Sequence, residues 1–448
     1  MENSTKTNDS IISRRKFIGS TMATAAFAIV PRHVLGGSGY ISPSDKLNIA
    51  CIGVGGKGRS DVQAVSSENL VAFCDVDDER AAETYKKFPD VKRYRDFRVM
   101  LEKEKNIDAV VVSTPDHTHA VISMMAIKMG KHVFCQKPLT HTVYEARRLA
   151  QAAREYKVAT QMGNQHQAEE EPRRLAEMIR DGAIGAVREV HIWTNRPVWP
   201  QGLDRPADTP PVPDTLDWNV WLGPAPARPY HPAYVPFDWR GWLDFGTGAL
   251  GDMGCHKFDP IMRALKLGYP TSVEASHSNF IKKMTWDEVT NTETYPRASI
   301  VRFEFPARDE LPPVTITWYD GGLKPFRPAE LERGRKLARK GNLIIGDKGK
   351  ILDGRLIPET TMQAYTLPPK TLPRSPGHYK EWIQACKGGE PAGSNFDFAS
   401  LVTETVLLGN IALRMGEKLE WDGKNIMITN HPDANQYLHR EYRKGWSL

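Results

Sequence analysis

Short, almost continuous apolar runs alternate with helical patterns in the chain after residue 46. The runs occupy residues 47–52, 70–74, 109–113, 132–135 and 159–162, with helical spacing at 78–87, 119–129 and 143–156. Unbroken apolar runs are typical of parallel strands covered on both faces. The alternation predicts an α/β domain over residues 46–165, built on a doubly wound parallel sheet.

The pattern changes after residue 165. Eleven prolines between Pro197 and Pro236 interrupt regular structure and predict a long functional loop at 196–247. Alternating, β-rich segments flank it at 187–194, 272–279, 299–305, 314–319 and 342–345, and a helical pattern at 398–415 ends at Gly416. We expect an α+β domain over residues 166–448 with a mostly antiparallel sheet.

The first 45 residues have the pattern of an export signal. Ser13-Arg14-Arg15-Lys16-Phe17-Ile18 is a twin-arginine sequence, and an Ala-rich apolar stretch follows at 19–30. The alternative is an amphipathic or disordered arm that holds two adjacent arginines by chance. The pattern predicts recognition by the twin-arginine export machinery and delivery of the folded protein to the periplasm. No later apolar segment is expected to reach membrane length.

Charge and cysteine content narrow the possible partners. The 448 residues include 60 Lys+Arg and 54 Asp+Glu, a net charge of +6 with no long basic run, so we expect no nucleic-acid partner. The five cysteines are far apart and lack CxxC spacing. This argues against a zinc site and against a disulfide framework.

A glycine turn directly follows the first apolar run. Gly53, Gly55 and Gly58 form a G-x-G-x-x-G sequence, with Gly56 and Lys57 between the last two glycines. Such glycines allow a tight turn, close approach of the backbone to a pyrophosphate, and close packing of the next helix. A glycine-rich hairpin is the alternative. The context after a strand predicts a dinucleotide site of the Rossmann type.

Asp75 ends the second predicted strand and sets the expected cofactor. A carboxylate there accepts hydrogen bonds from ribose hydroxyls, and no arginine adjoins it to bind a 2′-phosphate. NAD is therefore expected over NADP, although Arg80 or Lys57 could still reach a phosphate. The alternative for Asp75 is that it caps the helix that starts at Asp78.

Three later residues suit alcohol oxidation. Lys137 ends the strand from residue 132, at the edge where open α/β sheets bind ligands. Asp252 and His256 are four apart, on one face of a predicted helix, so the carboxylate can orient the imidazole. His256 suits the base and Lys137 the cation that stabilises an alkoxide. Two potential ligands without a third make a poor zinc site, and no metal is expected.

From residue 46 onward the chain resembles the Gfo/Idh/MocA family of oxidoreductases. The family's E-K-P motif matches Gln136-Lys137-Pro138, and its D-x-x-x-H pair matches Asp252 and His256. Thr114, Pro115 and His119 resemble its nicotinamide-side loop. The resemblance implies a Rossmann domain joined to a large open sheet, an active-site lysine at Lys137, and a homo-oligomer. Gln136 departs from the usual glutamate and removes a negative charge beside Lys137.

The substrate side is marked by aromatic residues. Six tryptophans lie between Trp193 and Trp242, and sugar rings stack on such faces. The alternative is that they anchor the proline-rich loop to the protein or to another subunit. The candidates for substrate contact are Asn164, Gln165, His166, Trp199, Trp239 and Arg240.

Three functions fit these features. The first is an NAD-dependent oxidoreductase that acts on a secondary alcohol of a sugar, glycoside or cyclic polyol and holds its cofactor tightly. The second is an NAD-dependent glycosidase that works by transient oxidation at C3 and elimination. The third is a secreted, non-catalytic carbohydrate-binding protein that retains the cofactor.

Overall fold

The computed structural model describes residues 45–281, 284–289 and 291–448. The twin-arginine sequence and the apolar stretch after it lie outside these residues. Residues 47–448 form one compact unit, and the description below concerns that unit.

The first sheet is parallel and confirms the expected doubly wound architecture. Its order in the described residues is β3-β2-β1-β4-β5-β6, which is the order of a dinucleotide-binding fold. The strands are β1 (Asn48–Ile52), β2 (Asn69–Cys74), β3 (Lys92–Tyr94), β4 (Ala109–Val112), β5 (His132–Gln136) and β6 (Thr160–Gly163). The helices of this half are α3 (Lys57–Val65), α4 (Asp78–Lys87), α5 (Phe97–Lys103), α6 (Asp116–Lys128) and α7 (Val143–Glu155).

The second sheet is mixed and mostly antiparallel, with the order β15-β14-β13-β7-β12-β11-β8-β16-β17. The expected strands are β7 (Val187–Trp193), β8 (Ser272–His277), β11 (Ser299–Phe305), β12 (Val314–Tyr319) and β13 (Gly341–Gly346). Only β7 and β12 pair in parallel among the described strands of this sheet. Short strands extend its edges: β14 (Lys350–Leu352), β15 (Arg355–Ile357), β16 (Leu419–Asp422) and β17 (Met427–Ile428). A separate hairpin pairs β9 (Phe280–Ile281) with β10 (Glu288–Val289).

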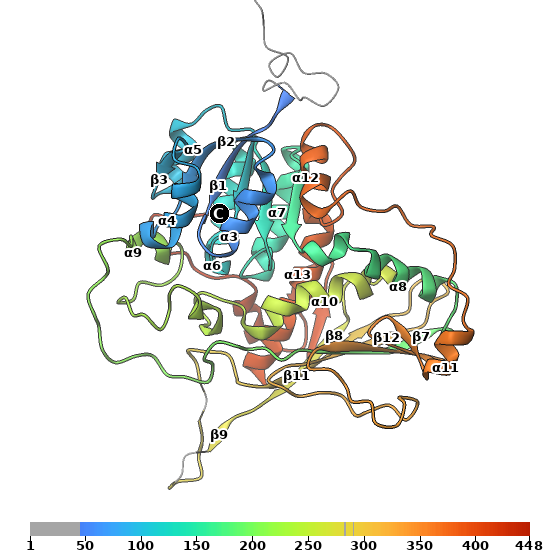
Figure 1. Ribbon diagram of the computed structural model, residues 1–448. Coiled ribbons are helices and arrows are strands. Elements are labelled where there is room, and N and C mark those ends of the chain that lie inside the picture. The colour runs from blue at the N-terminus through green and yellow to red at the C-terminus, as the bar shows by residue number, and fades with distance from the viewer. Residues whose placement is uncertain (1–44, 282–283, 290) are drawn as a thin grey trace, which may run out of the picture. The chain divides into compact units, whose positions relative to one another are not determined.

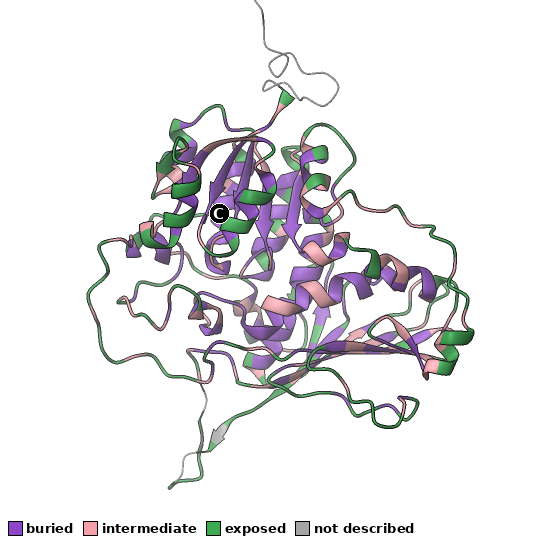
Figure 2. Cartoon of the chain, in the orientation of Figure 1, coloured by how far each residue is buried: buried purple, intermediate pink, exposed green. Residues whose placement is uncertain are grey.

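Helices that follow the parallel sheet in the chain join the two sheets. Figure 1 shows α10 (Gly248–Ala264), α13 (Phe396–Met415) and α8 (Glu170–Arg180) between the parallel sheet and the mixed sheet. One apolar core contains residues of both sheets together with α10 and α13. Figure 2 shows the central strands of the parallel sheet mostly buried, and exposed residues on the outer sides of α3 and α4.

Helix α13 corrects one expectation. It is long and apolar enough to cross a membrane by length and composition, whereas no such segment was expected after the leader. However, 83% of its apolar window is buried inside the protein. Its composition is therefore that of a core helix surrounded by other elements on most sides.

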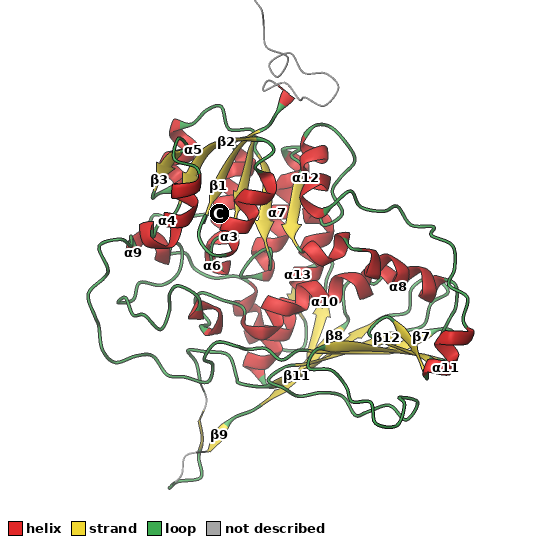
Figure 3. Cartoon of the chain, viewed as in Figure 1, coloured by secondary structure: helices red, strands yellow, loops and turns green. Residues whose placement is uncertain are grey.

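The proline-rich segment at 196–247 is mostly loop, and it is well anchored. It contains the short helix α9 (Trp218–Leu222) and a 3₁₀ turn η4 (Asp238–Gly241), visible among long loops in Figure 3. The rings of Trp218 and Trp221 stack with centroids 4.7 Å apart, within a buried aromatic cluster that also includes Trp239 and Trp242. Anchoring is therefore one observed role of these tryptophans.

Arg147 offers a test of how the two halves are held together. Its guanidinium, on α7, donates to both oxygens of Glu404 on α13, at 2.5 and 2.8 Å, and Glu404 is fully buried. Arg147→Ala leaves a buried carboxylate without its cationic partner, so we expect the free energy of unfolding to fall by about 3–5 kcal/mol. Urea unfolding measures the change. The control Arg148→Ala removes an exposed side chain that bonds Gln151, and should change stability by less than about 0.5 kcal/mol. Equal effects of the two substitutions would contradict this account.

Candidate active site

A cavity of about 380 Å³ lies at the carboxyl ends of the parallel strands. Residues of the glycine turn and of the ends of β2, β4 and β5 line one side. The proline-rich segment covers the other, and its lining residues include Leu216, Trp221, Trp239 and Arg240. This is the place where open α/β sheets bind ligands.

The glycine turn has the geometry that a dinucleotide requires. Gly53 has a φ of 77°, and a Cβ there would lie 2.7 Å from the carbonyl oxygen of Ser113. A Cβ on Gly58 would lie 1.7 Å from the carbonyl oxygen of Gly53. Neither position accepts a side chain, so α3 begins tightly against β1 and β4. The N-terminus of α3 is thus free to face a pyrophosphate.

Asp75 holds the glycine turn from the end of β2. Its Oδ2 accepts from the backbone N–H groups of Val54 and Gly55 at 2.8 and 3.1 Å, and its Oδ1 accepts from the N–H of Asp77 at 3.1 Å. Burial raises the pKa of Asp75 to about 6, against the lowering effect of these hydrogen bonds. The cap of α4 is Asp77, which accepts from Glu79 and Arg80, so the capping alternative for Asp75 fails.

Arg80 lies over the same turn. A Cβ on Gly56 would meet its Nη2 at 2.6 Å, and Arg80 also lines the cavity. The guanidinium therefore lies where it can reach an anionic part of a bound dinucleotide.

A carboxylate on another element supplies the negative charge that Gln136 lacks. Its amide nitrogen donates to Oδ2 of Asp61, on α3, at 2.8 Å, and Ser113 donates to the same oxygen at 2.7 Å. The Lys57 ammonium and the Tyr379 hydroxyl each lie 2.6 Å from Oδ1 of Asp61, whose side chain is fully buried. The negative charge missing at position 136 is thus present one contact away, and it also fixes Lys57. Sequence reasoning missed Asp61, although its place four residues after Lys57 on a helix is a recognisable ion-pair spacing.

The loop after β4 is fixed by His119. Thr114 and Pro115 line the cavity, whereas His119 is buried behind them, with Nε2 2.8 Å from the carbonyl oxygen of Thr114 and Nδ1 2.8 Å from that of Pro138. Both ring nitrogens must donate to these carbonyls. Burial lowers the pKa of His119, but the neighbouring Cys135 and Asp116 outweigh it and raise the value to about 9. A protonated His119 therefore ties the loop after β4 to the loop after β5.

Lys137, which lines the cavity, forms an ion pair with Asp252 beside it. The ammonium of Lys137 lies 2.5 Å from Oδ1 of Asp252 and 2.9 Å from its carbonyl oxygen. Burial opposes ionisation of Asp252, but the charges of Lys137 and Arg240 lower its pKa overall. Asp252 and His256 were expected to pair with each other on one face of the helix. In the structure Asp252 bonds Lys137 instead, and His256 bonds Asn164.

The tautomer of His256 follows from its neighbour. Asn164 donates its amide nitrogen to Asp259 at 2.8 Å, so its oxygen must accept from Nδ1–H of His256, 2.9 Å away. Nε2 of His256 is then left unprotonated. Burial, followed by the charge of Lys137, lowers the pKa of His256 to about 3, so the imidazole is neutral at physiological pH. His256 lines the cavity together with Lys137.

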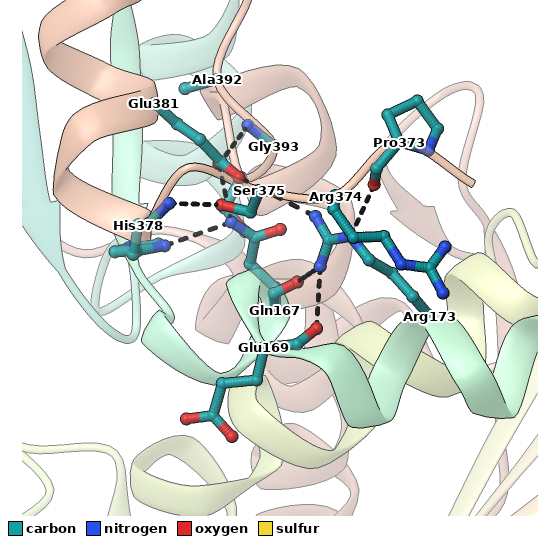
Figure 4. Close-up of polar contacts among 12 residues, drawn as sticks. Gln167, Glu169, Arg173, Pro373, Arg374, Ser375, His378, Glu381, Ala392 and Gly393 are labelled. Carbon is teal, nitrogen blue, oxygen red and sulfur yellow. Dashed lines mark hydrogen bonds and ion pairs between the residues drawn. The ribbon is translucent and has the colours of Figure 1, made fainter. Parts of the chain in front are cut away.

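The segment with Gln165 and His166 is held by a polar network. The turn η3 (Gln165–Ala168) ends where Arg173 donates to the carbonyl oxygens of Gln167 and Glu169, as Figure 4 shows. Gln167 in turn donates to Glu381 at 2.9 Å; Glu381 belongs to α12 (His378–Cys386). Only the beginning of this turn reaches the cavity. Gln165 lines it, whereas His166 pairs with Glu169 at 2.9 Å.

The structure brings some of the expected substrate residues together and separates others. Trp239 and Arg240 line the cavity, and the Arg240 guanidinium lies 4.2 Å from the centroid of a Trp239 ring. Asn164 is fully buried and serves His256. Trp199 is also buried and donates to Gln201.

Asp116 was missed by sequence reasoning. It follows Thr114-Pro115 at the start of α6, lines the cavity and accepts from Thr247 at 2.6 Å. Burial raises its pKa. The sequence signal that could have identified Asp116 is its position directly after Thr114-Pro115.

Two family models match the chain. The oxidoreductase family with an NAD-binding Rossmann fold matches residues 47–164, and its C-terminal α/β domain matches residues 189–293. Myo-inositol 2-dehydrogenase of Thermotoga maritima is 30% identical over 161 residues, which are 34% of this chain and 47% of that protein. Levoglucosan dehydrogenase of Pseudarthrobacter phenanthrenivorans is 25% identical over 247 residues, 52% and 55% of the two chains. The chain thus spans about half the length of these curated relatives.

Solved structures share the fold at low identity. The WlbA dehydrogenase of Bordetella pertussis, in complex with NADH and UDP-GlcNAcA, has a TM-score of 0.59 at 16% identity, over 84% of this chain and 99% of that one. An inositol dehydrogenase homologue of Azotobacter vinelandii, with NADH and myo-inositol, has a TM-score of 0.54 at 17% identity, over 84% and 98%. With both domain models matched in order, and with this fold, the chain belongs to the Gfo/Idh/MocA oxidoreductase family.

Proposed function

We propose that this protein is an NAD-dependent oxidoreductase that oxidises a secondary alcohol of a sugar, glycoside or cyclic polyol. The observation that carries the proposal is that Lys137 and His256 line the same cavity as the glycine turn. A cation and a neutral base thus face the place where a dinucleotide would present its reactive end. The curated relatives named as myo-inositol and levoglucosan dehydrogenases support this class of substrate.

The residues of the cavity divide the chemistry between them. Bound NAD would supply the acceptor for the hydride, held by the glycine turn, Asp75 and the loop at Thr114. Nε2 of His256 accepts the hydroxyl proton, because its lone pair is free and Nδ1–H is engaged by Asn164. The Lys137 ammonium stabilises the negative charge that develops on the oxygen. Asp252 holds Lys137 in place at 2.5 Å.

Tight retention of NAD is part of the proposal. The leader predicts export of the folded protein, and a protein outside the cytoplasm needs a cofactor that it carries with it. The proline-rich segment supports this, because backbone hydrogen bonds join Asp78 to Thr215 and Asp217 to Val76 beside the cavity. This segment therefore covers the cavity near Asp75.

Mass spectrometry of the native protein, followed by a sugar and polyol panel, tests the proposal. We expect bound NAD and a rise in absorbance of the reduced nicotinamide with at least one alcohol. Net cleavage of a glycoside without a change in bound NADH would instead assign the glycosidase reaction. The protein would instead be a carbohydrate-binding protein if it bound sugars without any absorbance change and if its Lys137→Ala variant bound them equally well.

Lys137 should be essential for the rate. Lys137→Met removes the positive charge that stabilises the alkoxide, so kcat should fall by about 10²–10³-fold. Stopped-flow absorbance of NADH measures the step. The control is Lys131→Met, whose ammonium donates to the carbonyl oxygen of Lys105 at 3.4 Å. An unchanged rate in Lys137→Met would remove this residue from the mechanism.

Asp75 predicts a pH dependence of NAD binding. Its folded pKa of about 6 lies above the ordinary value, so the carboxylate is ionised above about pH 6 and protonated below it. The ionised form accepts ribose hydroxyls better, and the dissociation constant for NAD should rise as pH falls from 7.5 to 5. Calorimetric titration measures the constant at each pH. Asp75→Asn should bind weakly with little dependence on pH, and a wild-type constant that is flat over this range would contradict the role of Asp75.

A further inference from the structure

Three cationic side chains surround one carboxylate beside the cavity, and two of the three, Lys137 and Arg240, line the cavity itself. Asp252 lies 2.5 Å from Nζ of Lys137, 3.5 Å from Nε of Arg196 and 3.8 Å from Nε of Arg240. The side chain of Asp252 is 11% exposed. Within the described residues, it is the one carboxylate that forms an ion pair with each of the three cations. The group as a whole therefore carries an excess of positive charge.

Two further acidic groups lie near these cations, and burial disfavours the charged form of both, against the opposing charge of Arg240. Asp116 faces the same cavity, but burial raises its pKa and it bonds the Thr247 hydroxyl. Asp238 precedes Arg240 by two positions, and its pKa is also raised by burial. Arg240 forms its ion pair with Asp252 instead.

The two arginines keep donors for a ligand. A guanidinium has five N–H donors. Arg240 donates one hydrogen bond, to the carbonyl oxygen of Phe237 at 3.3 Å, and Arg196 donates one, to the side chain of Asn195 at 3.3 Å. Their contacts with Asp252 are longer than direct hydrogen bonds. The side chain of Arg196 is 32% exposed and that of Arg240 is 21% exposed, so the remaining donors are accessible.

The orientation of Arg240 is fixed in advance. Its guanidinium lies 4.2 Å from the centroid of a Trp239 ring and 4.5 Å from that of Phe237. Arg240 lines the cavity together with Lys137 and His256. A planar guanidinium held in this way matches the two oxygens of a carboxylate and loses little freedom on binding.

We propose that the substrate is a sugar acid, whose carboxylate binds Arg196 and Arg240 while the hydroxyl to be oxidised lies against Lys137 and His256. This inference rests on the proposed function and deepens it. The acid group itself is unchanged in the reaction: the carbinol carbon loses a hydride, with its two electrons, to NAD and becomes a ketone, and the hydroxyl proton goes to His256.

A bound carboxylate also assists the base. The charge of Lys137 is one cause of the low pKa of His256, after burial. A negative charge brought in at Arg196 and Arg240 opposes this cationic field and raises the proton affinity of the imidazole. An acidic substrate should therefore gain in kcat as well as in KM, compared with a neutral sugar of the same shape.

A panel of matched pairs tests the proposal on the full chain loaded with NAD. Glucuronate, galacturonate and mannuronate are each compared with the parent sugar, the neutral uronamide and the 6-phosphate, by NADH absorbance. We expect kcat/KM for one uronate to exceed that of its uronamide by about 30-fold or more. Equal rates for acid and amide, or preference for the 6-phosphate, would overturn the carboxylate assignment and leave the oxidoreductase proposal standing. Failure of every compound to reduce NAD would count against both.

Variants locate the effect. Arg240→Gln and Arg196→Gln should each reduce the ratio of kcat/KM for uronate to uronamide by about 10-fold or more, because each removes one guanidinium from the carboxylate. The matched control is Arg188→Gln, an exposed arginine on β7 that pairs with Asp347 at 2.8 Å, and it should keep the wild-type ratio. An unchanged ratio in both Arg240→Gln and Arg196→Gln would contradict the proposed binding mode.

Discussion

The ion pair between Lys137 and Asp252 is the contact on which the site depends. Lys137 follows the last residue of β5 in the parallel sheet, and Asp252 lies in the first turns of α10 in the second half of the chain. Neither half has a complete site alone. Both side chains are largely buried, and each would be costly to bury without the other. The pair therefore links the position of the cation in the cavity to the packing of α10.

A second set of contacts places the base in the same way. His256 is one turn beyond Asp252 on α10, and it bonds Asn164, the residue after β6. Asn164 bonds Asp259, which pairs with Arg263 at 2.7 Å. The chain of contacts thus runs along one face of α10 and back to the parallel sheet. Asn164 acts as a positioning residue, since it fixes which nitrogen of His256 carries the proton.

Much of the fold could be predicted because local patterns of apolar and polar residues indicate its helices and strands. The strands at Ser299–Phe305 and Val314–Tyr319 alternate buried and partly exposed residues along their whole length, and they were predicted with the bounds they have. The edge strand Lys92–Tyr94 has no apolar run, and β14 and β15 are three residues each. Such segments are strands because of their neighbours, which a local pattern does not show.

The site was predictable as a set of residue types, while their pairing was not. The glycine turn, Lys137, Asp252 and His256 follow from motifs and spacing. The partner of Asp252 is 115 positions away, and that of His256 is 92 positions away, so spacing on one helix suggested a different pair. Asp61 was hidden for a similar reason. Its role beside Gln136 arises where α3 and β5 meet, 75 positions apart in the chain.

The central claim is that Lys137 and Asp252 act as one unit at the junction of the two halves. A double-mutant cycle of Lys137→Met and Asp252→Asn, followed by the single-turnover rate of NAD reduction, tests this most directly. If the pair is a unit, the double variant should be no slower than the slower single variant, because one substitution already removes the function of both residues. Rate losses that multiply in the double variant would show that the two residues act independently, and would contradict this account.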